Sequence, residues 1–175
     1  MFTLLSIALC IYYGESYMLT RDPDNLCKAY GNGTFFDISG VLEYPAQAQG
    51  PGINPAIWNY WYSPCKLYPC DGYPDTNDNA VCQLADQYYN CGTMQNAVWL
   101  WNGVYSEEGG ASFSIYYPGG WQGSWRNSNV TFIQDSTVTE PKIQFISESP
   151  YLQYNFIIRA PCIGQDGCNN TFTNV

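Results

Sequence analysis

Short apolar and aromatic runs, interrupted every few residues by glycine or proline, are the feature that most limits the folds open to this chain. In several runs apolar and polar residues alternate, as in 129–133, "NVTFI". This period of two is typical of a strand with one buried face, and helical periodicity is nearly absent. The pattern predicts an all-β fold, a flattened β-barrel or sandwich of two antiparallel sheets.

The predicted strands lie within residues 33–42, 58–63, 96–101, 111–118, 128–135, 142–147 and 152–160. Residues 43–56 and 70–79 are rich in Gly, Pro, Asp or Asn, which predicts loops. A chain of 175 residues is long enough for one domain with its own core, and no linker or internal repeat divides it.

The charge and residue composition exclude several classes of function. A formal net charge of −9 with six Lys plus Arg argues against nucleic-acid binding. With no histidine, Ser-His and Cys-His catalytic arrangements are impossible. Glycoside hydrolysis would need a carboxylate pair such as Glu107 with Glu148, and nothing in the sequence brings them together. We therefore expect a protein that is not an enzyme, with a surface suited to neutral polar ligands.

The N-terminus resembles a secretory signal. Residues 2–13 form an apolar run that is too short to span a bilayer, and Gly14 and Ser16 occupy the −3 and −1 positions of a cleavage site. We predict a signal peptide over 1–16 and a single domain over 17–175; the alternative is a buried N-terminal strand or helix. No second stretch approaches transmembrane length, so no membrane span is expected.

Cysteines also indicate the secretory pathway. Loss of Cys10 with the signal leaves seven: Cys27, Cys65, Cys70, Cys82, Cys91, Cys162 and Cys168. Without histidine or a repeated C-x2-C pair they predict disulfides rather than zinc, and we expect no metal or cofactor. Oxygen ligands for calcium occur in 71–79, but their spacing is not that of an EF-hand and suits a turn.

Three N-glycosylation sequons, at Asn32, Asn129 and Asn169, agree with this location. The chain is expected in the lumen of the endoplasmic reticulum, Golgi or endosome–lysosome system, or outside the cell. An odd cysteine would remain free or bond another chain.

An ordered succession of segments carries a more specific resemblance. "FFDISGVL", "YWYSPC", "AVCQ", "FSIYYPGG", "WRNSNVTF", "PKIQFISES" and "YNFIIRAPC" follow one another between Cys27 and Cys162. This order resembles the mannose 6-phosphate receptor homology (MRH) domain, the P-type lectin family, over about residues 27–162. The resemblance implies a flattened β-barrel of two sheets.

It also implies a mannose pocket made by Gln83, Arg126, Glu148 and Tyr154. By family precedent, Gln83 and Arg126 would contact the axial 2-hydroxyl, and Glu148 and Tyr154 the 3- and 4-hydroxyls. An amide, a guanidinium, a carboxylate and a phenol supply the donors and acceptors that sugar hydroxyls require. The structural alternative places Gln83 on the surface, pairs Arg126 with Glu148 and buries Tyr154 in the core.

The disulfides that the resemblance favours are Cys27–Cys65 and Cys70–Cys82. Cysteines usual in the family are absent after the "PGG" turn, at Gln153 and at Gln134, which leaves Cys162 to pair with Cys168 or Cys91. Loss of the bridge beside Tyr154 calls the rigidity of the pocket into question.

The function implied is a lectin for terminal mannose on the N-glycans of glycoproteins, acting in sorting or quality control. Unphosphorylated mannose is favoured over mannose 6-phosphate, because "GGWQGS" lacks phosphate-binding groups and the net charge is negative. Trp121 is a candidate second sugar contact, whereas Trp58 and Trp61 are expected in the core. The alternative is an adaptor of the same fold without sugar affinity, in Golgi, endosomal or autophagy trafficking. With either function, a protein partner or a covalent dimer through the odd cysteine is a further expectation.

Overall fold

A computed structural model describes residues 16–52, 56–66, 70, 79–104, 110–119 and 125–164. Within these residues the regular structure is β-strand, apart from one turn of 3-10 helix, η1 (Ile38–Gly40). The predicted all-β class is thus confirmed. The proposed signal segment lies outside the described residues except for Ser16, and so do Glu107, Trp121 and Asn169.

The strands form two sheets. The larger has eight strands in the order β11 (Lys142–Glu148), β12 (Gln153–Ala160), β10 (Asn127–Gln134), β9 (Ala111–Tyr117), β8 (Val98–Val104), β1 (Tyr17–Arg21), β2 (Lys28–Gly31) and β3 (Thr34–Asp37). The smaller has the order β4 (Ala46–Pro51), β5 (Ile57–Tyr62), β6 (Asn79–Leu84) and β7 (Tyr88–Thr93). The described strands do not close into a barrel, so the fold is an open sandwich.

One pair of strands departs from the predicted antiparallel arrangement. β10 and β12 run parallel, in register from Asn127 opposite Gln153 to Gln134 opposite Ala160. This happens because β11 forms a hairpin with β12 and the returning strand inserts between β11 and β10. The parallel pair brings the start of β10 beside the start of β12.

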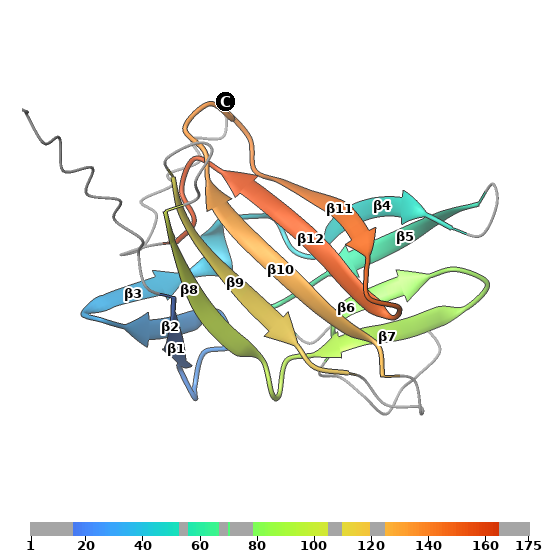
Figure 1. Cartoon of the computed structure of the whole chain (residues 1–175), viewed down its shortest axis with the longest axis horizontal. Coiled ribbons are helices and arrows are strands. Elements are labelled where there is room, and N and C mark those ends of the chain that lie inside the picture. The colour runs from blue at the N-terminus through green and yellow to red at the C-terminus, as the bar shows by residue number, and fades with distance from the viewer. Residues whose placement is uncertain are drawn as a thin grey trace, which may run out of the picture.

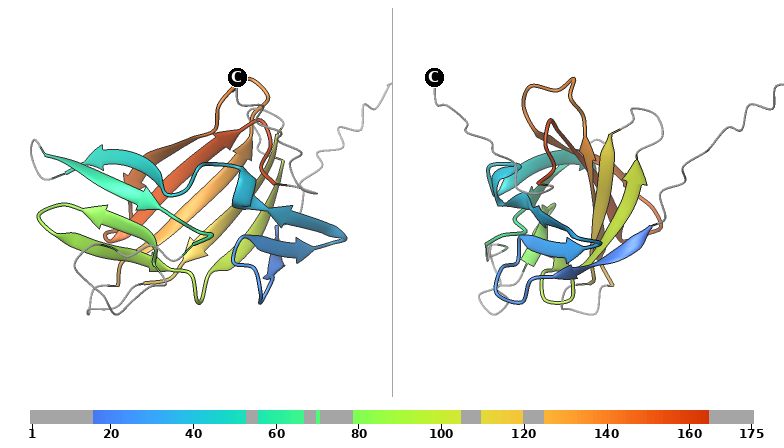
Figure 2. Two further views of the ribbon diagram at one scale, coloured as in Figure 1. Left: turned by 180° about the vertical axis from the view of Figure 1, so that it is seen from behind. Right: turned by 90° about the vertical axis from the view of Figure 1, so that its left-hand side faces the viewer.

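The four-stranded sheet covers one half of the larger sheet. Figure 1 shows β8, β9, β10 and β12 side by side, with β1–β3 at one end and β4–β7 behind the other. The opposite view in Figure 2 places the hairpins β4–β5 and β6–β7 in front of the long strands. The β1–β3 end of the larger sheet extends beyond this cover.

The core lies between the inner faces of the sheets. The rings of Trp99, Phe113 and Phe132 form a stack, with centroids 5.5 and 4.6 Å apart. On β10, Val130 and Phe132 are buried while Asn129 is half-buried on the outer face, as the alternating pattern predicts.

The prediction of a loop over 43–56 is wrong in part, because β4 lies within it. Its composition, Ala-Gln-Ala-Gln-Gly-Pro, has low β propensity, yet its burial alternates in the manner of a strand. The small residues are explained by tertiary packing. A Cβ added at Gly50 would lie 2.6 Å from the ring of Phe145 on β11, so glycine allows the two sheet edges to meet.

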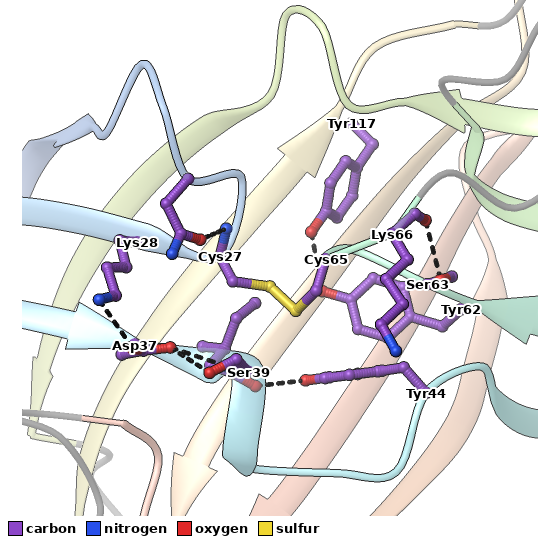
Figure 3. Close-up of a disulfide and its surroundings, with 12 residues drawn as sticks. Cys27, Lys28, Asp37, Ser39, Tyr44, Tyr62, Ser63, Cys65, Lys66 and Tyr117 are labelled. Carbon is purple, nitrogen blue, oxygen red and sulfur yellow. Dashed lines mark hydrogen bonds and ion pairs between the residues drawn. A yellow bond between two sulfur atoms is a disulfide. The ribbon is translucent and has the colours of Figure 1, made fainter.

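Both favoured disulfides are confirmed. Cys27–Cys65 joins the start of the β2 hairpin to the segment after β5, and so links the two sheets covalently (Figure 3). Cys70–Cys82 ties the segment before β6 to the strand itself. It therefore anchors the residue immediately before Gln83.

The remaining described cysteines differ in their pairing. Cys91 is free and fully buried, whereas Cys162 is disulfide-bonded. Cys91 is therefore not the partner of Cys162. Because its thiol does not reach the surface, Cys91 cannot supply the covalent dimer that the odd cysteine suggested.

The two described sequons lie in different parts of the larger sheet, one in a turn and one in a strand. Asn32 is exposed in the β2–β3 turn, with a φ of 50° beside Gly33. Asn129 is half-buried on the central strand β10, between Tyr116 and Asn155. No helix within the described ranges is long and apolar enough to cross a membrane.

Candidate functional site

The four residues predicted to bind a ligand line one pocket. Its volume is about 920 Å³, and Gln83, Arg126, Glu148 and Tyr154 all face it. Other lining residues are Ala56, Ile57, Trp58, Ala85, Asp86, Tyr89, Tyr151 and Leu152. Residues as far apart in sequence as 83 and 154 therefore meet at a single site.

Both sheets contribute to this site. Gln83 comes from β6 of the smaller sheet, next to Cys82. Glu148 ends β11 directly opposite Tyr154 of β12. Arg126 precedes β10, whose first residue lies opposite Gln153 in the parallel pair. The unusual parallel pairing thus places Arg126 beside Tyr154.

Gln83 is not the surface residue of the structural alternative. It is 1% exposed, and its Nε2 donates a hydrogen bond to Tyr60 Oη at 2.9 Å. Tyr60 lies directly opposite it on β5. The amide oxygen has no hydrogen-bond partner within the described part of the chain, so the side chain offers an acceptor to the pocket.

Arg126 is held by two tyrosines. Its Nε donates to Tyr154 Oη at 3.2 Å, and its Cζ lies 4.1 Å from the centroid of the Tyr89 ring. Tyr89 in turn donates through its hydroxyl to Asp86 Oδ1 at 3.0 Å. Among the described residues, Arg126 and Glu148 form no ion pair, which removes that part of the structural alternative.

Glu148 anchors the turn between β11 and β12. Its Oε1 accepts a hydrogen bond from the backbone N–H of Leu152 at 3.0 Å, and Leu152 has a φ of +64°. The carbonyl oxygen of Leu152 accepts from the backbone N–H of Asn127 at 3.0 Å. These bonds fix the segment that leads into Tyr154, where the disulfide usual in MRH domains is absent, and no described residue bonds to Glu148 Oε2.

Tyr154 is buried in the hydrophobic core, as the structural alternative expected, and it also lines the pocket. Burial raises the pKa of Tyr154 well above its usual value, although the neighbouring Arg126 opposes the shift. The Tyr154 hydroxyl therefore stays protonated at neutral pH. It accepts from Arg126 and retains a proton that it can donate.

Cys91 is buried on β7, the strand that pairs with the β6 strand of Gln83. Burial raises the pKa of its thiol far above the usual value, so it is a protonated thiol at neutral pH. Its backbone carbonyl accepts a hydrogen bond from Ser128 Oγ at 2.8 Å, which ties β7 to β10. The backbone of Cys91 thus takes part in a contact between the two sheets.

The sequence did not identify Tyr60, Asp86 or Tyr89. Tyr60 and Tyr89 lie opposite Gln83 on the two strands that flank β6, and Asp86 lies in the turn between β6 and β7. A reliable prediction of strand register would have identified the two tyrosines as neighbours of Gln83. Trp58, expected in the core, is half-buried and lines the pocket, while Trp61 lies against Tyr88 with ring centroids 5.9 Å apart.

The described residues hold no group of three or more His, Cys, Asp or Glu side chains that could bind a metal ion. The site instead offers hydrogen-bond donors and acceptors beside apolar surface. No protein-family model matches the chain, and no curated protein matches it.

Proposed function

We propose that this protein is a lectin of the secretory pathway that binds the terminal mannose of N-glycans without chemical turnover. The observation that carries the proposal is the convergence of Gln83, Arg126, Glu148 and Tyr154 in one pocket. The resemblance to MRH domains had selected these four residues from their sequence order alone. The family membership itself is part of the proposal.

The free hydrogen-bonding groups suit a sugar hydroxyl, which both donates and accepts. Gln83 offers a carbonyl oxygen and Glu148 a carboxylate oxygen, while Arg126 offers N–H groups and Tyr154 a hydroxyl. Charged partners strengthen such bonds. A site built in this way rejects an epimer that leaves its polar groups unpaired. We assign Gln83 and Arg126 to the 2-hydroxyl, and Glu148 and Tyr154 to the 3- and 4-hydroxyls.

The pocket charge supports unphosphorylated mannose rather than mannose 6-phosphate. One guanidinium, of Arg126, faces two carboxylates, of Asp86 and Glu148, among the described lining residues. A phosphomonoester would add roughly −1.5 to −2 charges at neutral pH. The repulsion disfavours it, and so does the net charge of −9.

The disulfides are consistent with a luminal or extracellular location. The lectin would therefore meet mannose-containing N-glycans on glycoproteins during sorting or quality control. An adaptor without sugar affinity would share the fold but would not bind the glycans, so a binding experiment distinguishes the two.

The test is titration of the protein with methyl α-mannoside and a glycan array bearing plain and phosphorylated high-mannose structures. Arg126→Ala should lower the affinity for the mannoside by at least about tenfold, because a charged donor to the ligand is lost. Gln83→Met should act in the same direction. Arg159→Ala is the matched control, since Arg159 pairs with Asp135 at the far end of β12. Folded wild-type protein that binds no mannoside would refute the lectin proposal and favour the adaptor.

A further inference from the structure

The Arg126 guanidinium is the cation of the pocket, and it is held from one side by a tyrosine outside the predicted set. The Tyr89 ring lies 4.1 Å from Arg126 Cζ, well inside the range of about 6 Å for a favourable cation–π interaction. In the described part of the chain only Nε of Arg126 makes a hydrogen bond. The ring of Tyr89 and the hydroxyl of Tyr154 therefore place the guanidinium while leaving both Nη groups for a ligand.

Tyr89 is itself held by Asp86. Its hydroxyl donates to Asp86 Oδ1 at 3.0 Å, and the same oxygen accepts from the backbone N–H of Gln87 at 3.1 Å. Asp86 and Gln87 form the turn of the β6–β7 hairpin, and Tyr89 lies opposite Gln83 in that hairpin. One hairpin thus presents the buried amide and orients the guanidinium.

Asp86 also brings a negative charge to the mouth of the pocket. It is exposed and lines the pocket together with Arg126 and Glu148. The charge of Asp86 has little effect on the binding of a neutral sugar. It repels an anionic substituent from Arg126, the one cation among the described lining residues.

We propose that Asp86 and Tyr89 are a positioning and specificity pair: Tyr89 orients Arg126 for the sugar, and Asp86 fixes Tyr89 and selects neutral over anionic sugars. This inference rests on the proposed lectin function and extends it to the chemical class of the ligand. The preference for neutral sugars would then depend on the Asp86 side chain and not only on the net charge of the chain.

The experiment compares the affinities of methyl α-mannoside and mannose 6-phosphate by isothermal titration, at low and high salt. Asp86→Asn should raise the affinity for the phosphorylated sugar, relative to the neutral one, by about fivefold at low salt and by less at high salt. Glu140→Gln is the matched control, because it removes an equal charge from an exposed loop at the opposite end of β11.

The role of the ring is tested separately. Tyr89→Leu should weaken the binding of both sugars by about fivefold, whereas Tyr89→Phe, which keeps the ring, should restore most of the affinity. If Asp86→Asn shifts the ratio no more than Glu140→Gln, or if Tyr89→Leu binds as the wild type does, the inference is overturned and the lectin proposal stands. A wild-type protein that binds neither sugar overturns both.

Discussion

Two tyrosines on one face of β5 have different surroundings. Tyr62 and Tyr117 are buried, and their hydroxyls hydrogen-bond to each other at 2.8 Å beside the Cys27–Cys65 disulfide (Figure 3). Two residues earlier, Tyr60 accepts its hydrogen bond from Gln83, beside a pocket where Tyr154 accepts from Arg126. In the first region, which we call the closed cluster, the polar groups satisfy one another.

The difference separates a cluster whose polar groups bond to one another from a pocket that keeps unused hydrogen-bonding atoms. Both regions contain buried phenols whose pKa is raised by burial. In the closed cluster the hydroxyls of Tyr62 and Tyr117 bond to each other. At the pocket, an amide, a guanidinium and a carboxylate each keep a hydrogen-bonding atom that no described residue uses.

The largest effect is expected from the disulfide of the closed cluster. Cys27→Ala with Cys65→Ala should lower the free energy of unfolding by ~4 kcal/mol, because the bridge closes a long loop of the unfolded chain. Denaturant unfolding measures this loss. Affinity for the mannoside, measured below the melting temperature, should stay within about twofold of the wild type.

Removal of the Cys70–Cys82 disulfide should affect both stability and binding, unlike removal of the disulfide in the closed cluster. Cys70→Ala with Cys82→Ala should cost ~3 kcal/mol, since the loop is shorter. It should also lower the affinity for the mannoside, because Cys82 precedes Gln83. Equal effects of the two double variants on affinity would contradict the division into two regions.

Removal of single tyrosine hydroxyls should have smaller effects, on stability in the closed cluster and on sugar affinity at the pocket. Tyr62→Phe should destabilise the protein by about 1–3 kcal/mol, because it leaves the buried hydroxyl of Tyr117 without its partner, and adding Tyr117→Phe should recover most of the loss. Tyr154→Phe should instead reduce sugar affinity more than stability. Thermal melts and titrations on the same samples measure both, and a Tyr154→Phe protein with wild-type affinity would show that its hydroxyl does not contact the ligand.

The smallest effect concerns pH. Asp37 is partly buried, which raises its pKa, but hydrogen bonds from Ser39 and the ion pair with Lys28 outweigh this and lower the pKa. A depressed pKa stabilises the folded state above the usual aspartate value of about 3.8, and this stability is lost as the pH falls through the lower folded value.

Asp37→Asn keeps an acceptor for Ser39 and loses the ion pair. It should lower the free energy of unfolding at neutral pH by less than about 1 kcal/mol. It should also flatten the decline of this free energy below pH ~4. Urea unfolding at several pH values measures the free energy of unfolding as a function of pH. Identical pH dependence of the variant and the wild type would contradict this account of Asp37.

Some features could be predicted because they depend on local patterns. Alternation on β10 and β12 defines which residues face the core, and the short strands between turn signals define the all-β class. The two disulfides and the four pocket residues came from the order of segments that resembles MRH domains. Their convergence required the fold.

Other features had no local signal. β4 consists of residues with weak strand propensity, and it pairs because Gly50 lets the sheet edge approach Phe145. The neighbours of Gln83 depend on strand register, since Tyr60 and Tyr89 face it from strands on either side. A shift of one residue would turn both rings to the other face of the sheet.

The sequence alone determined the class of fold and, through its resemblance to MRH domains, the two cysteine pairs, because periodicity and the order of segments are written along the chain. The tertiary structure decided that β10 and β12 run parallel, that Cys91 is buried and that the Tyr89 ring lies against Arg126. The burial of Cys91 and the parallel pairing depend on which strands lie side by side, and the contact of Tyr89 with Arg126 joins residues 37 positions apart in the sequence, so all are properties of non-local packing.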